Sequence, residues 1–309
     1  MALSIRQSAS SVRPPRLKPG DKVRFVSPAS APQREAVLQR AERLEEWGLR
    51  VDFGEHAFRK VGYLAGTDDE RLADINAALC DDNVRAIFTT RGGKGSYRIA
   101  DRLDFDAARR DPKFLVGFSD ITILHLALWK HCGISGIHGS LVDVDGHFGL
   151  QNEVSLRRLL MAEEPIVIRS RSAEMTSTLT TSGVAEGVLL GGNLDSIATA
   201  AGWALPPLDG AILLLEAVNM QLGQVDRQLT MLRKAGHLAG LAGVAIGQFT
   251  GFQPSNWFTI VDLLREHLAS IEVPVLGGLP LGHGDEPLST PLGVMATLDA
   301  TSQDLTVGR

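Results

Sequence analysis

Short apolar runs alternate along the first half of the chain with segments whose apolar residues recur at helical spacing. The run at 23–26 ends at Ser27-Pro28, and the segment 35–47 then has apolar residues three and four positions apart and is closed by Gly48. The same alternation predicts strands at 49–53, 84–89, 114–118 and 134–137, and helices at 68–79, 97–103 and 121–129. This α/β pattern is typical of a doubly wound, mostly parallel sheet with helices on both faces.

The second half of the chain predicts another α/β unit. Strands are expected at 187–190, 211–215, 244–249, around Val275 and at 294–298, with helices at 195–203, 226–234 and 257–268. The Gly- and Pro-rich stretch 279–298 favours more antiparallel pairing at its end. Between the two units, periodicity weakens and Ser, Thr, Glu and Arg accumulate. We therefore expect a flexible leader at 1–20, an N-terminal domain at 21–145, a linker at 146–182 and a C-terminal domain at 183–309.

Composition narrows the possible partners. A chain of 309 residues favours two compact units, and a net charge of −5 with interleaved signs argues against a nucleic-acid-binding face. The most basic stretch, 13–18, is interpreted as part of a solvated leader. The two cysteines, Cys80 and Cys132, lie among aliphatic neighbours and indicate buried thiols in a reducing compartment. No apolar run has the length of a signal peptide or a membrane span, so we expect a cytoplasmic protein without a membrane partner.

Candidate chemistry gathers directly after the predicted strands. Ligands bind beyond the carboxyl ends of parallel strands, so these positions are the first candidates for a site. Four of them carry suggestive residues, namely Arg91-Gly92-Gly93, Gly117-Phe118-Ser119-Asp120, Glu216 and Gly282-His283-Gly284.

Ser119 lies at an abrupt strand-to-helix junction. A nucleophile is exposed at such a junction, and the amides that open the next helix point toward developing negative charge, as acyl transfer requires. The alternative interpretation is that Ser119 is only the N-cap of the helix beginning at Asp120.

The glycines of the 91–95 turn allow backbone amides to approach a ligand, so an oxyanion donor could come from here. The turn lacks the Gly-Lys-Ser/Thr ending of a phosphate loop, and the alternative interpretation is a simple tight turn.

Glu216 and His283 are candidates for a catalytic pair. Glu216 ends a buried apolar run, where an acid is costly unless something pairs with it, and His283 between two glycines can serve as a general base. Either residue could instead be incidental, an acid that emerges into solvent or a lone loop histidine. His125 and His138 are interpreted as core or supporting groups.

A metal site is a weaker interpretation of two other stretches. Asp285 and Glu286 follow His283, and the segment 143–147 contains two aspartates and a histidine. Neither matches a helical His-x-x-x-His arrangement or an EF-hand loop, so no metal and no cofactor are expected.

Taken together, the spaced motifs resemble the LD-carboxypeptidase family of serine peptidases, which includes the self-immunity peptidases that act on microcin C-type antibiotics. The matching stretches run in order from near residue 20 to near residue 300. They are Val26-Ser27-Pro28-Ala29-Ser30, Arg91-Gly92-Gly93, Asp104-Phe105-Asp106 with Pro112-Lys113, Gly117-Phe118-Ser119-Asp120-Ile121-Thr122, His138-Gly139, Gly191-Gly192-Asn193-Leu194, Leu215-Glu216, Asp226-Arg227 with Leu229, Gly278-Leu279-Pro280, Gly282-His283-Gly284 and Pro291-Leu292-Gly293.

The resemblance implies a Ser-Glu-His triad in a cleft between the two domains, with Ser119 as nucleophile, Glu216 as the acid and His283 as the base. It also implies oxyanion and substrate contacts from the Asp120 amide, from Gly92 and Gly93, and from Asn193 of the second unit. The family's members are usually homodimers. The implied reaction is cleavage of an L,D peptide bond in a murein tetrapeptide, with release of terminal D-alanine.

Two departures from the family pattern bear on the substrate. Lys94 stands where the family commonly has an aromatic residue, and the loop after His283 lacks an expected asparagine. An alternative activity is therefore that of a microcin C-type immunity peptidase, for which Trp203 or Trp257 could stack on a nucleobase. An alternative of another class is a two-domain binder of a small ligand without chemistry.

Overall fold

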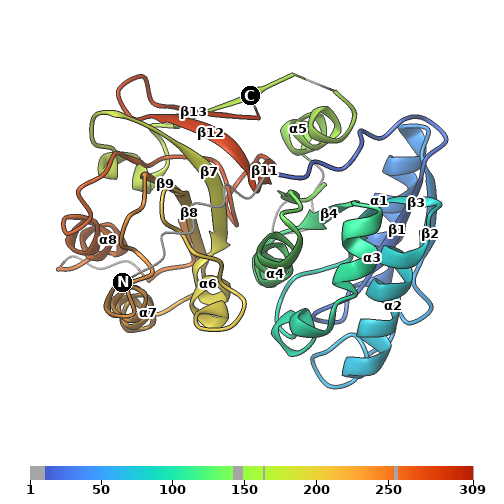
Figure 1. Ribbon diagram of the computed structural model, residues 1–309. Coiled ribbons are helices and arrows are strands. Elements are labelled where there is room, and N and C mark those ends of the chain that lie inside the picture. The colour runs from blue at the N-terminus through green and yellow to red at the C-terminus, as the bar shows by residue number, and fades with distance from the viewer. Residues whose placement is uncertain (1–10, 142–148, 163, 254–256, 309) are drawn as a thin grey trace, which may run out of the picture.

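Two α/β lobes lie side by side, and each is built on its own sheet (Figure 1). The computed structural model describes residues 11–308 apart from 142–148, 163 and 254–256. None of the helices in these ranges is long and apolar enough to cross a bilayer. The two-domain α/β architecture predicted from the sequence is confirmed.

The first lobe contains a six-stranded sheet in the order β11-β5-β4-β3-β1-β2. Its strands are β1 (Lys22–Val26), β2 (Arg50–Phe53), β3 (Val84–Thr89), β4 (Phe114–Gly117), β5 (Gly136–His138) and β11 (Thr290–Leu292). Strands β1 to β5 pair in parallel and β11 runs antiparallel to β5. The connecting helices are α1 (Arg34–Glu46), α2 (Asp68–Cys80), α3 (Phe105–Arg110) and α4 (Thr122–Cys132). The predicted, mostly parallel sheet is thus present, and its carboxyl edge faces the other lobe's loops.

The second lobe contains a seven-stranded mixed sheet in the order β10-β9-β8-β7-β12-β13-β6. Its strands are β6 (Ile166–Arg169), β7 (Val184–Asn193), β8 (Ile212–Val218), β9 (Gly243–Thr250), β10 (Val275–Leu276), β12 (Val294–Asp299) and β13 (Asp304–Val307). The helices are α6 (Leu194–Ala200), α7 (Leu222–Lys234) and α8 (Ile260–Leu268). Strands β7 to β10 are parallel, whereas β12, β13 and β6 pair antiparallel, as the Gly- and Pro-rich end of the chain suggested.

The expected linker is more ordered than its composition suggests. Helix α5 (Leu150–Met161), strand β6 and the 3₁₀ helix η4 (Met175–Leu179) all form within it. Leu156 and Leu160 lie four positions apart on α5 and are both fully buried, and β6 pairs with β13. The segment therefore belongs to the packed structure, because its few apolar residues are correctly spaced for one helix and one edge strand.

Two further expectations are corrected. Within the expected flexible leader, Leu17 is buried, its amide donates to Leu160 O at 2.8 Å, and Val12 bridges to Ile134. Residues 11–20 are therefore attached to the first lobe, and the rest of the expected leader lies outside the described residues. The predicted helix at 97–103 is instead two short 3₁₀ helices, η1 (Ser96–Arg98) and η2 (Ala100–Arg102).

Helix α4 joins the two lobes. Its residues from Thr122 to Trp129 are all buried, so it has no solvent face, as expected of a helix covered on both sides. It packs against α6 and β7 of the second lobe, and Figure 1 shows α4 and α6 facing each other between the sheets. One apolar cluster contains Ile123 and Leu124 together with Leu194 and Ile197. A shared core therefore fixes the lobes around the loops that lie between them.

Candidate active site

Ser119 begins the 3₁₀ helix η3 (Ser119–Ile121), directly between β4 and α4. Its φ of 64° is in the left-handed region, which side chains other than glycine rarely adopt. The strand-turn-helix junction predicted at this position is therefore present and strained. Such strain is concentrated at functional turns, where it projects a side chain away from the sheet.

The 91–95 turn lies against the Ser119 side chain. A Cβ atom added to Gly92 would be 2.7 Å from Ser119 Cβ and 3.1 Å from Ser119 Oγ. Gly93 has a φ of 95°, and a Cβ there would be 2.4 Å from Ser30 Oγ. Only glycine allows the backbone to come this close, so Gly92 brings the main chain against the Ser119 side chain, and Gly93 packs the same turn against Ser30.

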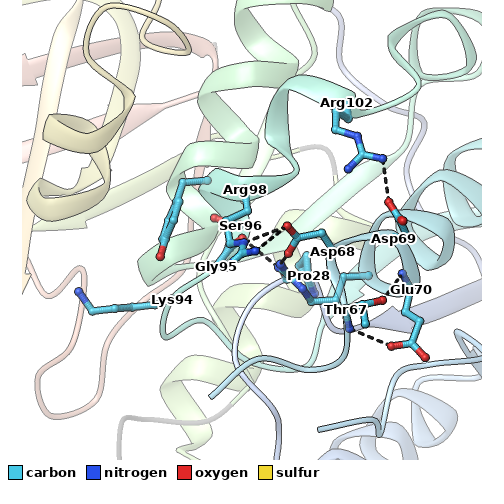
Figure 2. A network of polar contacts seen from close by, with 12 residues as sticks. Pro28, Thr67, Asp68, Asp69, Glu70, Lys94, Gly95, Ser96, Arg98 and Arg102 are labelled. Carbon is cyan, nitrogen blue, oxygen red and sulfur yellow. Dashed lines mark hydrogen bonds and ion pairs between the residues drawn. The ribbon is translucent and has the colours of Figure 1, made fainter. Parts of the chain in front are cut away.

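Arg71, on α2, holds the 91–95 turn in place. Its side chain is fully buried, and Nη1 donates to Pro28 O and, at 2.9 Å, to Gly95 O. Asp68 pairs with Arg71 and with Arg98, whose Nη2 lies 2.9 Å from Asp68 Oδ2. Figure 2 shows Asp68 and Arg98 meeting beside Gly95 and Pro28. The network ties together the two loops that flank Gly92 and Gly93.

Asp120 fixes the other side of the turn that carries Ser119. Its carboxylate accepts a hydrogen bond from the Ser96 amide at 2.7 Å, and Ser96 Oγ donates to Asp120 O at 2.6 Å. Burial raises the pKa of Asp120, against the opposing effect of the Ser96 bonds. The side chain is thus occupied in joining η3 to η1, and only the backbone amide of Asp120 is left for the predicted oxyanion contact.

Glu216 and His283 form a buried hydrogen-bonded pair. His283 Nδ1 lies 2.6 Å from Glu216 Oε2, and Glu216 is fully buried near the end of β8. Gly282, with a φ of 125°, has no room for a side chain because its Cβ would be 2.8 Å from Glu216 Cβ. Burial works to raise the pKa of Glu216, but the charge and hydrogen bond of His283 hold it below its usual value. The acid is therefore ionised at neutral pH.

The loop that carries His283 is held on both sides. Thr250 Oγ1 donates to His283 O at 2.8 Å, and the Gly284 amide donates to Gln248 Oε1 at 2.8 Å. The His283 ring lies 4.7 Å from the Phe118 ring, centroid to centroid, which places it beside the residue that precedes Ser119. No hydrogen bond joins Ser119 to His283, both of which the structure describes. Catalytic hydrogen bonds are often long until substrate is bound.

Asn193 ends β7 opposite Glu216 in the strand register. Its side-chain oxygen accepts a hydrogen bond from the Ser196 backbone amide at 3.3 Å and caps α6. The backbone amide of Asn193 donates to Thr122 Oγ1 at 3.1 Å. Asn193 also favours the ionised form of Glu216 and lowers its pKa. The residue therefore links the nucleophile helix, the acid and the second lobe.

These residues surround one cavity of about 1340 Å³ between the lobes, lined by Gly92, Gly93, Ser119, Asn193 and His283. Both lobes contribute charged side chains to its wall. Lys94 Nζ lies 3.3 Å from Asp195 Oδ2, so an ion pair crosses from the 91–95 turn to α6. The structure thus brings the predicted site residues from both halves of the chain to a single cleft.

The other candidates from the sequence are the two possible metal sites and the histidines His125 and His138. No group of three metal-ligating side chains is present among the described residues, and the 143–147 stretch lies outside them. His125 and His138 are buried, as predicted. Sequence reasoning missed Gln248 and Arg71. Gln248 stands out as a polar residue in the apolar strand β9, whereas nothing in α2 distinguishes Arg71 from a surface arginine.

Comparison with known proteins identifies the family of the chain. Residues 23–139 match the LD-carboxypeptidase N-terminal domain, and residues 186–298 match the LD-carboxypeptidase C-terminal domain. A putative carboxypeptidase of Streptomyces coelicolor is 37% identical over 96% of this chain and 96% of its own length. A probable murein peptide carboxypeptidase of Bacillus subtilis is 32% identical over 94% and 92%. A murein tetrapeptide carboxypeptidase of Pseudomonas aeruginosa is 30% identical over 90% and 93%.

Solved structures share the fold. A muramoyltetrapeptide carboxypeptidase from Oxalobacter formigenes superposes with a TM-score of 0.82 at 25% identity and covers 93% of this chain and 99% of its own. A microcin C7 self-immunity protein in complex with aspartyl sulfamoyl adenosine gives 0.85 at 23% identity, with 96% and 98% covered. At this identity the second likeness concerns the fold alone.

The two-lobed fold and its domain matches define a serine-type hydrolase. The chain belongs to the LD-carboxypeptidase family, since the two domain matches follow one another in order and span most of its length. It is thus a serine-type LD-carboxypeptidase, as the sequence motifs predicted.

Proposed function

We propose that the chain cleaves the L,D peptide bond of a murein tetrapeptide and releases the terminal D-alanine. The names of the relatives from Bacillus subtilis and Pseudomonas aeruginosa support this substrate class. The observation that carries the proposal is the 2.6 Å bond between the buried Glu216 Oε2 and Nδ1 of His283, which lines the same cavity as Ser119. A buried acid paired with a histidine suits acyl transfer when a partly exposed serine lines the same cavity.

In the proposed mechanism, Ser119 Oγ attacks the carbonyl carbon of the scissile bond. His283 takes the hydroxyl proton through Nε2, because Nδ1 faces Glu216, whose charge fixes the tautomer and stabilises the imidazolium. The amides of the 92–93 turn and of Asp120 would bind the oxyanion. Collapse of this intermediate breaks the peptide bond, and His283 gives the proton to the amine of D-alanine. Water then hydrolyses the acyl-enzyme by the same route.

Incubation of the purified chain with murein tetrapeptide tests this proposal. We expect release of D-alanine, measured by mass spectrometry, and a fall of at least about 10³-fold in kcat for Ser119→Ala, which lacks the nucleophile. Absence of D-alanine release by the wild type would contradict the substrate, and equal release by the variant would contradict the mechanism. Circular dichroism of both proteins controls for folding.

The microcin-type and binder alternatives receive less support from the cleft. Neither Trp203 nor Trp257 belongs to the residues that line the cavity, so neither of the two predicted tryptophans is placed to stack on a nucleobase there. Phe118 does line it, but its ring contacts His283 at 4.7 Å between centroids. A pure binder has no use for the buried Glu216–His283 pair, whose desolvation is costly.

We propose further that the protein works in the cytoplasm as a homodimer in peptidoglycan recycling. The family resemblance supports the dimer and the role. Cys80 and Cys132 form no disulfide, which is compatible with a reducing compartment, but Cys80 is exposed and Cys132 only partly buried, so the prediction that both thiols are buried is wrong. The mass of the purified chain in solution, determined by light scattering, tests the dimer. A monomeric mass at micromolar concentration would contradict it.

A further inference from the structure

Arg40 places a buried positive charge in the wall of the catalytic cavity. The residue lies on α1, and its side chain is 8% exposed. Nε donates to Ala36 O at 3.2 Å, Nη2 donates to Thr90 O, and the guanidinium lies 5.7 Å from the centroid of the Phe25 ring. Nη1 forms no hydrogen bond with a described residue. The group is therefore held firmly by neutral partners, and one edge of it is left for another ligand.

No carboxylate among the described residues forms an ion pair with Arg40. A buried guanidinium without a counter-charge is unfavourable, and burial accordingly lowers the pKa of Arg40 to about 10. The other cations of the cavity wall differ in this respect. Lys94 pairs with Asp195, Arg91 is exposed to solvent, and Arg171 is partly exposed and donates to Glu286 O. Arg40 is thus a desolvated charge that an anion in the cavity would compensate.

The charge lies close to the reaction centre. Its acceptor Thr90 comes two residues before Gly92, whose backbone lies against Ser119. The cavity wall around it is formed by Phe25, Phe88 and Val116 from the carboxyl ends of β1, β3 and β4. An apolar wall strengthens the attraction between a guanidinium and an anion, since little water screens it.

We propose that Arg40 binds the free carboxylate of the substrate's C-terminal residue. The inference rests on the proposed function, because a carboxypeptidase must distinguish a chain end from an internal residue. A planar guanidinium suits a carboxylate geometrically and keeps its charge at all relevant pH values. Arg40 is then a specificity-determining residue, and the pocket beside Phe25 receives the leaving D-amino acid.

The test compares two substrates that differ only at the chain end, murein tetrapeptide and the same peptide with a C-terminal carboxamide. For the wild type we expect kcat/KM to be higher for the free acid. Arg40→Gln should lower kcat/KM for the acid by roughly 10- to 100-fold, as for a lost charge-assisted hydrogen bond, and leave the amide almost unchanged. Arg40→Lys keeps a charge without the planar fork and should retain part of the preference.

Arg43→Gln is the matched control, because Arg43 lies on the same helix, is exposed and pairs with Glu46 instead of facing the cavity. It should keep the wild-type preference. An undiminished preference for the acid in Arg40→Gln would overturn the assignment. So would an equal loss for both peptides in a folded Arg40→Gln, since that is the result of a structural role.

Binding separates this inference from the proposed function. Both peptides are titrated by calorimetry into the Ser119→Ala protein, with and without Arg40→Gln. If the wild type releases no D-alanine, the proposed reaction fails, but tighter binding of the acid that Arg40→Gln abolishes still supports the carboxylate site. Equal binding of acid and amide by the Ser119→Ala protein would overturn it.

Discussion

The backbone conformation of Ser119 costs conformational free energy. A φ of 64° disfavours any residue with a Cβ by roughly 1–2 kcal/mol relative to glycine. Glycine at the same position loses about 0.5–1 kcal/mol through the greater freedom of the unfolded chain. The strain is the larger of the two energies, so a serine at position 119, the proposed nucleophile, lowers the stability of the protein relative to glycine.

We therefore predict that Ser119→Gly is more stable than Ser119→Ala by about 0.5–1 kcal/mol, although both lack the nucleophile. Urea unfolding followed by circular dichroism measures the difference. Ser155 on α5 provides the control, because in a helix glycine is less stable than alanine by about 1 kcal/mol and the sign should reverse. Equal stability of the two Ser119 variants would show that the turn relaxes.

At this scale the sequence predicts some site residues and misses others. Ser119, Glu216 and His283 each directly follow a strand or stand between glycines, which are local signals, and family motifs surround them. Their catalytic roles remain a prediction that Ser119→Ala tests. Arg40 has no such signal, since an arginine on an amphipathic helix is normally solvated. Its burial depends on how α1 packs on the sheet, which a local pattern does not contain.

The 91–95 turn shows how one element depends on another. Arg71 projects from α2 and donates to Pro28 O and Gly95 O, so a helix outside the cleft fixes the backbone beside Ser119. A Cβ on Gly95 would be 3.1 Å from Arg71 Nη1, so the contact is close. Displacement of catalytic amides by about 1 Å can cost roughly 100-fold in rate.

We predict that Arg71→Met lowers kcat toward murein tetrapeptide by about 10- to 100-fold while KM changes less, because the donors act mainly on the transition state. Arg71→Lys should restore part of kcat. The control is Arg102→Gln, which removes an exposed ion pair with Asp69 that Figure 2 shows at the outer end of the same network. A change confined to KM or to the folded fraction would exclude a positioning role.

Element prediction fails where tertiary pairing decides. The parallel strands and their helices follow from local periodicity. Strand β11 contains only Thr290–Leu292 and exists because this segment of the C-terminal half pairs with β5 in the first lobe's sheet. Strand β6 likewise depends on β13, which lies more than 130 residues later. Short strands of this kind have too few residues for a periodic signal. The sequence therefore predicts neither β6, which lies in the expected linker, nor β11, which lies in the Gly- and Pro-rich stretch.

Strand pairing and apolar packing hold the two lobes together. β11 adds a segment of the C-terminal half to the first lobe's sheet, and α4 and α6 share one apolar cluster. The exposed Lys94–Asp195 pair, by comparison, contributes at most about 1 kcal/mol. Packing and strand pairing thus hold the cleft together, and we expect the two lobes to unfold as one unit. The buried titratable groups then determine how the stability of this unit depends on pH.

Two buried histidines dominate that dependence. Burial lowers the pKa of His125 to about 3 and that of His138 to about 4, the latter against the raising effect of Glu216. In the unfolded chain both titrate near 6.5. Below pH 6.5 the two histidines therefore bind protons in the unfolded state but not in the folded state. The contribution of the two histidines to the free energy of unfolding is complete above pH 6.5 and is lost as the pH falls.

Between pH 6.5 and pH 5 each histidine should reduce the free energy of unfolding by up to about 2 kcal/mol. The lowered pKa of Glu216 keeps that acid out of this window. Two groups work in the opposite direction, His56, whose pKa Asp74 raises, and Asp120, whose pKa burial raises. Urea unfolding at pH 7.5 and pH 5.0 should show a loss of several kcal/mol in the wild type. His138→Gln should reduce the loss by about half, because a neutral amide takes up no proton in either state. A wild-type stability that stays level between these pH values would mean that water or structural relaxation admits the protons to the core.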